Sequence, residues 1–376
     1  MSKGWQRIFV PLMAVVIALA IASIIILFIA GVSGPSTGNP WNDFWNQIGE
    51  RFSFLGRAFQ AMFEGAFGSQ FAWMNTIIRM TPLILTGLAV GFGFRAGVFN
   101  IGAEGQMAMG ALMATVVAVN MPGVPMFVTI PICMLTGMLA GGLWAGIAGF
   151  LKAKTGAHEV ISTIMLNWIA SNITNWAVTA PFSTGSGTPK SPEIAVTAKL
   201  PILYSIEATF LSYGIIVAIL AALVMYIILY KTSMGYEVKA VGFNPYAAEY
   251  GGIRVSKNII MTMAISGALA GLAGTLESLG LYYRFYGTLT SGKGFDGISI
   301  ALIGQNHPLG IIFASMLISG LRTGSNQMQF IGVPKHIVTI IQSIIIFLVA
   351  AERIVRTILG WDRKKKVKDG LAKSAS

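Results

Sequence analysis

Long apolar runs alternate along this chain with short segments of glycine, proline and charged residues. A helix needs about 20 mainly apolar residues to cross the hydrocarbon core of a bilayer, and several windows meet this requirement on their own. The pattern therefore predicts an all-α fold, a polytopic transmembrane helical bundle that forms one domain over residues 1–376. The expected helices, about ten, lie at residues 9–31, 73–94, 105–120, 124–151, 158–181, 208–230, 257–280, 295–305, 308–322 and 336–358.

The eighth run, "GFDGISIALIG", is too short for an ordinary crossing. We expect it to be tilted, broken or re-entrant, with "QNHPLG" as the turn that follows. Interrupted spans are tolerated where protein or a water-filled cavity surrounds them. This feature is typical of a pore or a transporter.

Three connections are long enough to have structure of their own. Residues 32–72 carry aromatic and aliphatic side chains at helical spacing among charges, which predicts a helix lying at the membrane surface. Residues 182–207 read as a second outer loop, and both outer segments could contact a partner or simply be solvated. Residues 230–258 are expected in the cytoplasm, with a short helix near Pro245 to Tyr250 that ends at two glycines.

Composition supports a membrane protein. Charged residues make up 11% of the chain and hydrophobic residues 55%, whereas soluble domains carry about 25% charged residues. The net charge of +12 comes from cations in the short connections and the C-terminal tail, which fits the positive-inside rule better than a nucleic-acid surface. We expect both termini in the cytoplasm, the first run to be a retained helix rather than a cleaved signal peptide, and residues 359–376 to form a basic cytoplasmic tail.

Catalytic and metal-binding signatures are lacking in the sequence. Cys133 is the single cysteine, and the three histidines lie far apart with no partner at metal-ligand spacing. The stretch "GTLTSGKG", residues 287–294, resembles a phosphate-binding loop but has glycine where serine or threonine should hold magnesium, and it lacks the expected flanking strand and helix. We therefore expect no cofactor, no metal and no enzymatic activity in this chain, and ATP hydrolysis, if used, in another chain.

Polar residues inside apolar runs are the informative signal, because ionisable groups at bilayer depth usually face a cavity or a partner. The stretch "GFGFRAGVFNIGAEGQMAMG" places Asn100, Glu104 and Gln106 among glycines. These side chains either line a passage or satisfy the amides of a broken helix. The next polar run adds Glu159, Asn167 and Trp168 as candidates, although Glu159, close to a helix end, is better explained by a structural role.

Glycines four residues apart recur in the predicted spans and let membrane helices approach closely. Such pairs predict a compact bundle and say nothing about a substrate. They are Gly87 with Gly91, Gly137 with Gly141, Gly142 with Gly146, and Gly267 with Gly271.

Four stretches in this order resemble a known family: "FRAGVFNIGAEGQMAMGA", "HEVISTIMLNWIA", "GYEVKAVGFNPYAAEYGGI" and "GISIALIGQNHPLGI". They are similar to the membrane permease subunits of bacterial ABC importers of the branched-chain amino acid, ribose and simple-sugar superfamily. The first two are most similar to its nucleoside-uptake branch. The resemblance covers roughly residues 75–358.

The resemblance implies a type II-like importer permease in the bacterial cell membrane that moves a nucleoside or similar small polar solute. It also implies three partners: an ABC ATPase subunit that binds the ATP, a second homologous permease and an extracytoplasmic solute-binding lipoprotein. Residues 235–253 correspond to the segment that couples the permease to the ATPase. The residues of this sequence that we assign to coupling on that basis are Gly235, Glu237, Gly242, Asn244, Pro245, Ala247, Ala248, Glu249, Gly252 and Ile253.

Two positions depart from the family pattern: His158 stands where asparagine is usual, and Ser343 where glycine is common. The first adds a titratable group near a proposed gate, and the second should change only packing. Alternatives to nucleoside import are the same machinery carrying simple sugars or branched-chain amino acids, an ion-driven secondary transporter, and a membrane-embedded enzyme. Whether two different permeases or two copies of one permease pair is open at this stage.

Overall fold

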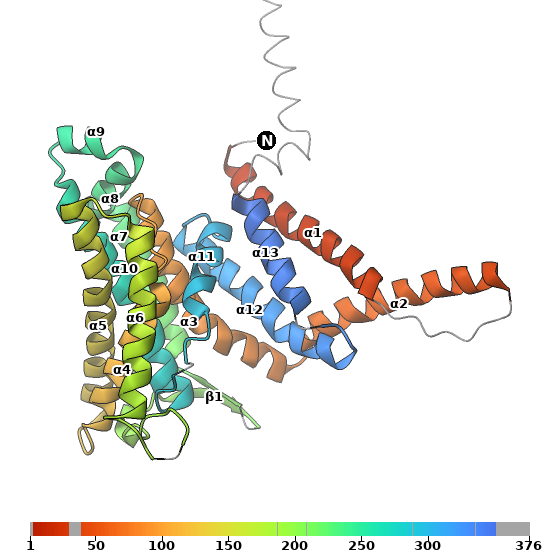
Figure 1. Cartoon of the computed structure of the whole chain (residues 1–376), viewed down its shortest axis with the longest axis horizontal. Helices are drawn as coiled ribbons and strands as arrows, with labels where there is room; N and C mark the ends of the chain where they lie inside the picture. The colour runs from red at the N-terminus through yellow and green to blue at the C-terminus, as the bar shows by residue number, and fades with distance from the viewer. Residues whose placement is uncertain are drawn as a thin grey trace, which may run out of the picture. The chain divides into compact units, whose positions relative to one another are not determined.

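The computed structural model describes residues 3–29, 39–185, 187–207, 209–287, 289–334 and 336–350. Contacts divide the chain into two compact units (Figure 1). Unit 1 comprises Met1–Trp73 with Gly320–Ser376, and unit 2 comprises Met74–Ser319. The predicted tail at residues 359–376 and the end of the last predicted helix, residues 351–358, lie outside the described residues.

Unit 1 is built on α1 (Lys3–Ile29), α2 (Pro40–Phe67) and α13 (His336–Ala350), with the adjoining ends of α3 and α12. Helices α1 and α13 lie side by side in Figure 1. Ala14 and Leu348 are buried between them, and Ile17 and Ile344 pack around this pair. The burial of small and branched apolar side chains along both helices accounts for their association.

Helix α2 confirms the helix predicted in the first outer segment. Its start is capped by Asn39, whose side chain accepts a hydrogen bond from the Trp41 amide (3.0 Å). Charged residues are spread along the helix, at residues 43, 50, 51, 57 and 64, so α2 contains no apolar window long enough to span a bilayer. Arg51 Nη1 donates to the Leu27 carbonyl near the end of α1 (2.6 Å), which ties α2 to the end of that helix. Its place at the membrane surface stays a prediction.

Unit 2 contains the remaining helices and one small sheet. Among the described residues, α3, α5, α7 and the continuous stretch Val255–Tyr282 are long and apolar enough to cross a membrane. The helices are α3 (Gln70–Arg95), α4 (Ala103–Val119), α5 (Met126–Thr155), α6 (Glu159–Thr179), α7 (Gly214–Lys231), α8 (Ser233–Phe243), α9 (Pro245–Tyr250), α10 (Val255–Glu277), α11 (Lys293–Ile303) and α12 (Pro308–Phe330).

Helices α4, α5 and α10 form the core of unit 2 and lie side by side in Figure 1. Their backbones touch at glycines. A Cβ atom on Gly141 would clash with the Gly267 carbonyl, and one on Gly110 would clash with Gly271. Three of these glycines belong to pairs that the sequence predicted to pack closely. Gly146 is different, because a Cβ atom there would meet nothing within 4 Å.

The eighth predicted span is a half-helix. Helix α11 has 11 residues, about 16 Å, against about 30 Å of hydrocarbon core. Gly297 packs on Thr86, near the middle of α3, and α11 ends at the turn 304–307, beside Arg95. Residues 283–287 and 289–292 have no regular helix, and the chain returns here from the far end of α10 to the middle of the bundle. The expectation of an element too short for an ordinary crossing is confirmed, and its re-entry into the membrane stays a prediction.

The predicted helix at 208–230 is wrong at its start. Residues Thr209–Ser212 form strand β2, which pairs antiparallel with β1 (Ile202–Ile206), and α7 begins only at Gly214. The Leu200 amide donates to the Leu279 carbonyl (2.9 Å), which fixes the hairpin at the end of α10. Polar residues and a tight turn favour the hairpin here. The prediction missed them because it averaged hydrophobicity over the whole range 208–230.

We expect Gly141→Ala to destabilise the chain and Gly146→Ala not to, although both lie on α5. The first methyl group has no room between two backbones, and overpacking costs about 1–3 kcal/mol. The second enters open space, where alanine favours a helix over glycine by about 0.5–1 kcal/mol. Thermal unfolding of the two purified variants in one detergent measures the contrast. Equal melting temperatures would contradict the close contact of α5 with α10.

Candidate functional site

The break between α3 and α4 is held by two side-chain amides. Asn100 Nδ2 donates to Gln106 Oε1 and Gln106 Nε2 donates back to Asn100 Oδ1, both at 2.9 Å. Asn100 also donates to Ser266 Oγ on α10 (2.8 Å) and accepts from the Gly102 amide (2.9 Å). Asn100, Gln106 and Ser266 are fully buried. Asn100 thus satisfies an amide of the broken backbone, and Gln106 holds the Asn100 side chain in place.

Glu104 caps the half-helix α11. Its carboxylate accepts hydrogen bonds from the Gly292 amide (2.8 Å) and the Gly294 amide (2.7 Å), at the first turn of α11. The first amides of a helix have no partner within it and favour a nearby anion. The side chain is half-buried. Gly292 and Gly294 belong to the stretch that resembles a phosphate-binding loop. Their amides donate to Glu104, so the end of that stretch is the capped start of a helix.

An ion pair beside this cap escaped the sequence analysis. Lys293 Nζ lies 2.9 Å from the Glu277 carboxylate, and Glu277 is buried at the end of α10. Lys293 also donates to the Leu289 carbonyl (2.9 Å). Both residues are isolated charges near apolar runs, which is a signal that the sequence does give. The sequence does not indicate that these two residues, from different elements, form a pair.

On α6, Asn167 holds the start of α4. Its Nδ2 donates to the Ile101 carbonyl and its Oδ1 accepts from the Gly105 amide, both at 2.9 Å. Trp168, the neighbouring residue, points away from the bundle with 67% of its side chain exposed. The structure therefore brings Asn100, Glu104, Gln106 and Asn167 together around residues 100–106, and it leaves Trp168 outside that group.

Glu159 lies at the first turn of α6 and serves as a tie between helix ends. Its Oε1 is 2.6 Å from Lys152 Nζ and accepts from the Phe99 amide (3.4 Å). His158, one of the two departures from the family pattern, is exposed, with Nδ1 3.9 Å from Glu159. These contacts support the structural role expected for Glu159.

The predicted coupling segment forms α8, α9 and the turn into α10. Asn244 caps α9 by accepting from the Ala247 amide (3.1 Å), and Pro245 takes the first helical position. The helix ends where Gly252 adopts a φ of 82° and the Ile253 amide donates to the Ala248 carbonyl (3.0 Å). The short helix predicted at Pro245–Tyr250 is confirmed, and glycine at 252 is required by its left-handed conformation.

Other residues of the coupling segment fix it to the bundle. The Gly235 amide donates to Thr232 Oγ1 (3.2 Å), and Glu237 Oε2 accepts from Asn258 Nδ2 on α10 (3.0 Å). Gly242 lies against the Arg95 carbonyl, where a Cβ atom would clash. The coupling segment is thus attached to both α10 and the end of α3, while Ala247 and Glu249 stay exposed.

Three aromatic side chains around α9 are almost fully exposed. The exposed fractions are 89% for Phe243, 78% for Tyr246 and 96% for Tyr250. Large aromatic side chains without cover mark interaction surfaces, where they are enriched. The sequence alone does not identify these side chains as exposed, because residue type does not report exposure.

Arg95 joins the end of unit 2 that carries α8 and α9 to the turn that follows α11. Its Nε donates to the Asn306 carbonyl (3.0 Å) and its Nη2 to the Gln305 carbonyl (3.1 Å). Both acceptor residues have positive φ, 52° and 53°. The guanidinium therefore stabilises a strained turn between α11 and α12, directly beside the contact of Gly242 with the Arg95 carbonyl.

The opposite end of unit 2 is fixed by the loop 182–207. Glu193 forms ion pairs with Lys199 and with Arg284 (3.1 Å). The hydrogen bond from Lys199 is the main cause of a lowered pKa of the Glu193 carboxyl. The Ser191 amide donates to the Phe285 carbonyl (2.9 Å). This loop therefore holds the segment that re-enters the bundle after α10.

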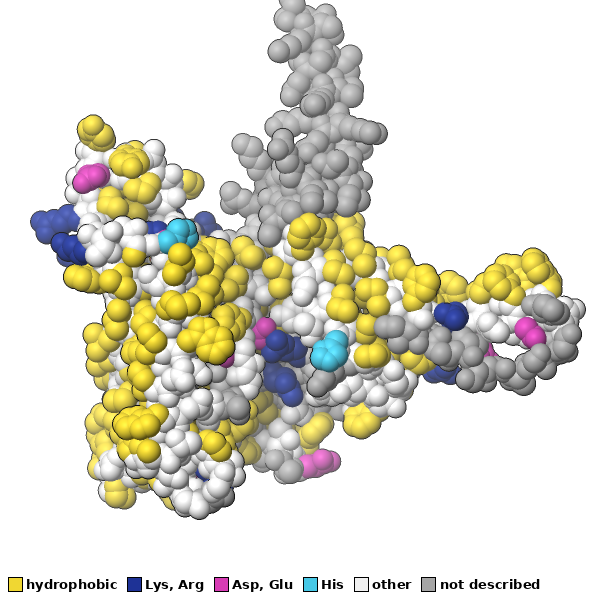
Figure 2. Space-filling view, viewed as in Figure 1, with side chains coloured by type: hydrophobic (Ala, Val, Ile, Leu, Met, Phe, Trp, Pro, Cys, Tyr) yellow, Lys and Arg dark blue, Asp and Glu magenta, His cyan; other side chains and the backbone are white. Residues whose placement is uncertain are grey.

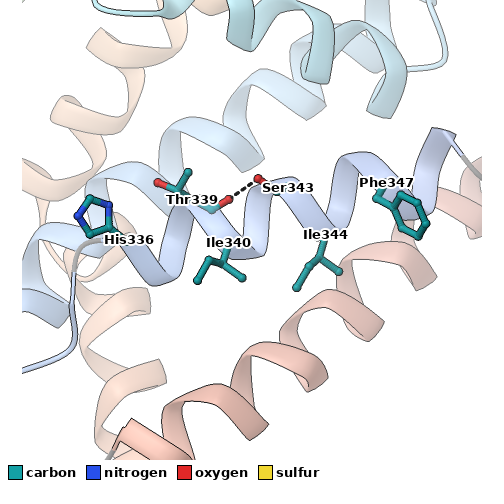
Figure 3. A pocket seen from close by; sticks show the side chains of 6 residues that line it. All are labelled: His336, Thr339, Ile340, Ser343, Ile344 and Phe347. Carbon is teal, nitrogen blue, oxygen red and sulfur yellow. Dashed lines mark hydrogen bonds between the residues drawn. The ribbon is translucent and has the colours of Figure 1, made fainter.

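Two further surface features are visible in the figures. Figure 2 shows hydrophobic side chains over the exposed faces of α4 to α6, with lysines and arginines gathered near the end that carries α8 and α9. A hollow of about 350 Å³ lies along α13 in unit 1 (Figure 3). Its lining belongs to α13 alone and is mainly apolar, and Ser343 Oγ there donates to the Thr339 carbonyl of its own helix (2.9 Å). No group of three potential metal ligands occurs among the described residues.

Known proteins of similar sequence are membrane permeases. The chain is 39% identical to the guanosine ABC transporter permease protein NupP of Bacillus subtilis, over 97% of this chain and 99% of that protein. It is 33% identical to the nucleoside ABC transporter permease protein NupB of Lactococcus lactis, over 96% and 95%. It is also 35% identical to the glucose ABC transporter permease protein TsgB13 of Haloferax volcanii, over 78% and 80%. No solved structure matches.

A family model described as the permease component of branched-chain amino acid transport systems matches residues 72–350. That range contains the Asn100 and Gln106 amide pair, the Glu104 cap, the half-helix and the coupling segment. The sequence resemblance to this family is thus confirmed. The chain is a multi-pass, all-α membrane protein and belongs to the family of branched-chain amino acid transport system permease components.

Proposed function

We propose that this chain is a permease subunit of an ATP-driven uptake system and forms half of the path of a nucleoside or a similar small polar solute. The observation that carries the proposal is the match to two permeases named for guanosine and for nucleosides, over nearly the full length of all three chains. The exposed aromatic surface around α9 supports it, since an ATPase in another chain needs a place to dock.

The proposal assigns three tasks to partners. The ATPase activity belongs to a subunit that docks on α8 and α9. A second permease forms the other half of the path. Two matched relatives from one organism, the guanosine permease proteins NupP and NupQ of Bacillus subtilis, support such a pairing. An extracytoplasmic binding protein delivers the solute. Both termini and the α8–α9 end lie in the cytoplasm, in agreement with the lysines in the last turn of α5.

Alternating access follows from the way the elements are joined. ATP binding in the partner presses on α8 and α9, which are attached to the ends of α3 and α10. The end of α3 holds the turn after α11 through Arg95. Movement at the coupling surface therefore reaches the half-helix, whose other end is capped by Glu104. In this mechanism the wall of the path is positioned by Asn100, Gln106, Asn167 and Glu159. The Trp168 side chain faces the path.

A second candidate solute is a simple sugar, because a relative named for glucose is 35% identical over most of the chain. Reconstitution decides between the candidates. Vesicles that contain this chain, the second permease, the ATPase and the binding protein should take up labelled nucleoside only with ATP on the ATPase side. Uptake of glucose instead would select the sugar. Uptake by this chain alone on an ion gradient would replace the ATP-driven mechanism.

Charge reversal on α9 tests the coupling surface. Glu249→Lys should lower solute uptake and transport-stimulated ATP hydrolysis by about tenfold, because a mismatched charge at a docking surface costs over a kilocalorie per mole. The folded permease should keep its melting temperature, since exposed substitutions change stability by less than about 0.5 kcal/mol. Glu207→Lys, an equal reversal on the exposed turn of the hairpin, is the matched control. Normal transport by Glu249→Lys would contradict docking at α9.

Replacing Glu104 distinguishes a cap from a direct contact with solute. Glu104→Ala removes both acceptors of the Gly292 and Gly294 amides, and it should reduce uptake about tenfold or more while the complex still assembles. Glu104→Gln keeps one acceptor oxygen and should retain an intermediate rate, because a lost cap costs about 1 kcal/mol. Uptake is normalised to assembled complex by size-exclusion chromatography. Equal losses in both variants would favour a charge contact with solute, and loss of the complex would give Glu104 a purely structural role.

A further inference from the structure

Helices α5, α6 and α7 of unit 2 expose two different kinds of face. On α5, the exposed large side chains from Ile132 to Phe150 are all apolar, among them Leu135, Leu139 and Leu143. The exposed face of α7 is equally apolar between residues 216 and 227, with Ile219, Leu220 and Leu223. Such faces fit lipid, which provides no hydrogen-bond partners.

Helix α6 is different over the half that lies away from Glu159. Trp168, Asn172 and Asn175 are exposed there and follow the spacing of one helical face, four and three residues apart. Asn172 Nδ2 donates to the Trp168 carbonyl (2.8 Å). An asparagine amide offers two donors and an acceptor oxygen with two lone pairs, so one bond of this kind leaves most of its capacity for a neighbour. Residues 158–181 are predicted to span the membrane, and amides at that depth face water or protein, since exposure to lipid is costly.

The re-entrant segment borders this face. A Cβ atom on Gly287 would clash with Asn175 Oδ1, so Gly287 lies beside Asn175. The same segment then descends to Glu104 and the start of α11. Asn175 lies about 24 Å along α6 from Glu159, near the end that the loop 182–207 covers. Asn172 and Asn175 therefore lie close to the point where the chain between α10 and α11 returns into the bundle.

We propose that Trp168, Asn172 and Asn175 form a solute-contacting wall for a flat heteroaromatic group, open to water at the end of the path opposite α8 and α9. The exposed indole offers a stacking surface, and the two amides offer donors and acceptors to the edge of a base, as in other recognition of unpaired bases. This wall rests on the proposed function and assigns it a specific surface. Asn172 and Asn175 thereby become specificity-determining residues.

Thiol accessibility tests the exposure to water. In a Cys133→Ser background, Asn172→Cys and Asn175→Cys are expressed with the partner subunits in whole cells and treated with a charged, membrane-impermeant methanethiosulfonate. We expect both to react at least about tenfold faster than Leu139→Cys on α5, because lipid keeps a thiol protonated and away from the reagent. Reaction of Asn175→Cys as slow as that of Leu139→Cys would overturn the proposal.

Solute protection and selectivity test the contact itself. Guanosine should slow the labelling of Asn175→Cys in the assembled complex, whereas ribose, which lacks the flat base, should not. Trp168→Ala should raise the guanosine concentration for half-maximal uptake about tenfold, in the range of a lost base–aromatic stack, and Trp168→Phe should restore most of it. Fast labelling without guanosine protection, or an unchanged half-maximal concentration, would overturn the contact.

The accessibility result separates this proposal from the proposed function. Water access to α6 is measured without transport, so a wild-type complex that fails ATP-dependent uptake but labels rapidly at Asn175→Cys would contradict only the uptake function. Rapid ATP-driven uptake with Asn172→Cys and Asn175→Cys both inert would contradict only the wall. Ile219→Cys on α7 provides a second lipid-facing control.

Discussion

The reciprocal hydrogen bonds between the side chains of Asn100 and Gln106 are the constraint on which the rest of unit 2 depends. A helix that breaks inside a bilayer leaves amides and carbonyls that no water can satisfy. Here Asn100 accepts a hydrogen bond from the Gly102 amide and donates one to Ser266. Ser266 in turn donates to the Ala89 carbonyl (2.5 Å). Helices α3, α4 and α10 are thereby fixed at one buried point.

That point determines where α4 begins and therefore where Glu104 lies. Because Glu104 is two residues before Gln106, its carboxylate is held beside α10 at the level where α11 starts. A helix that starts in mid-bundle needs an acceptor for its first amides, and a carboxylate also complements its dipole. These polar side chains thus have two roles: they satisfy a broken backbone, and they fix the start of α11.

Some of this architecture could be predicted and some could not. Helix α9 was predictable because its cap, proline and final glycines are local signals within residues 244–252. The half-helix was predictable from its length. The pairing of Lys293 with Glu277 was not, because it depends on the path of the intervening loop. The hairpin at 202–212 was missed for a similar reason, since an apolar window average conceals a turn whose register is set by pairing.

The joint at Arg95 limits how the molecule can move. The Gly242 backbone touches the Arg95 carbonyl without room for a Cβ atom, and the Arg95 guanidinium holds both left-handed residues of the turn after α11. Closely packed contacts transmit a displacement and do not absorb it. A displacement of α8 and α9 would therefore move the end of α3 together with the C-terminal end of α11. The other end of α11 is also held, because residues 283–287 share backbone hydrogen bonds with residues 189–194 and the Glu104 carboxylate accepts from the Gly292 and Gly294 amides.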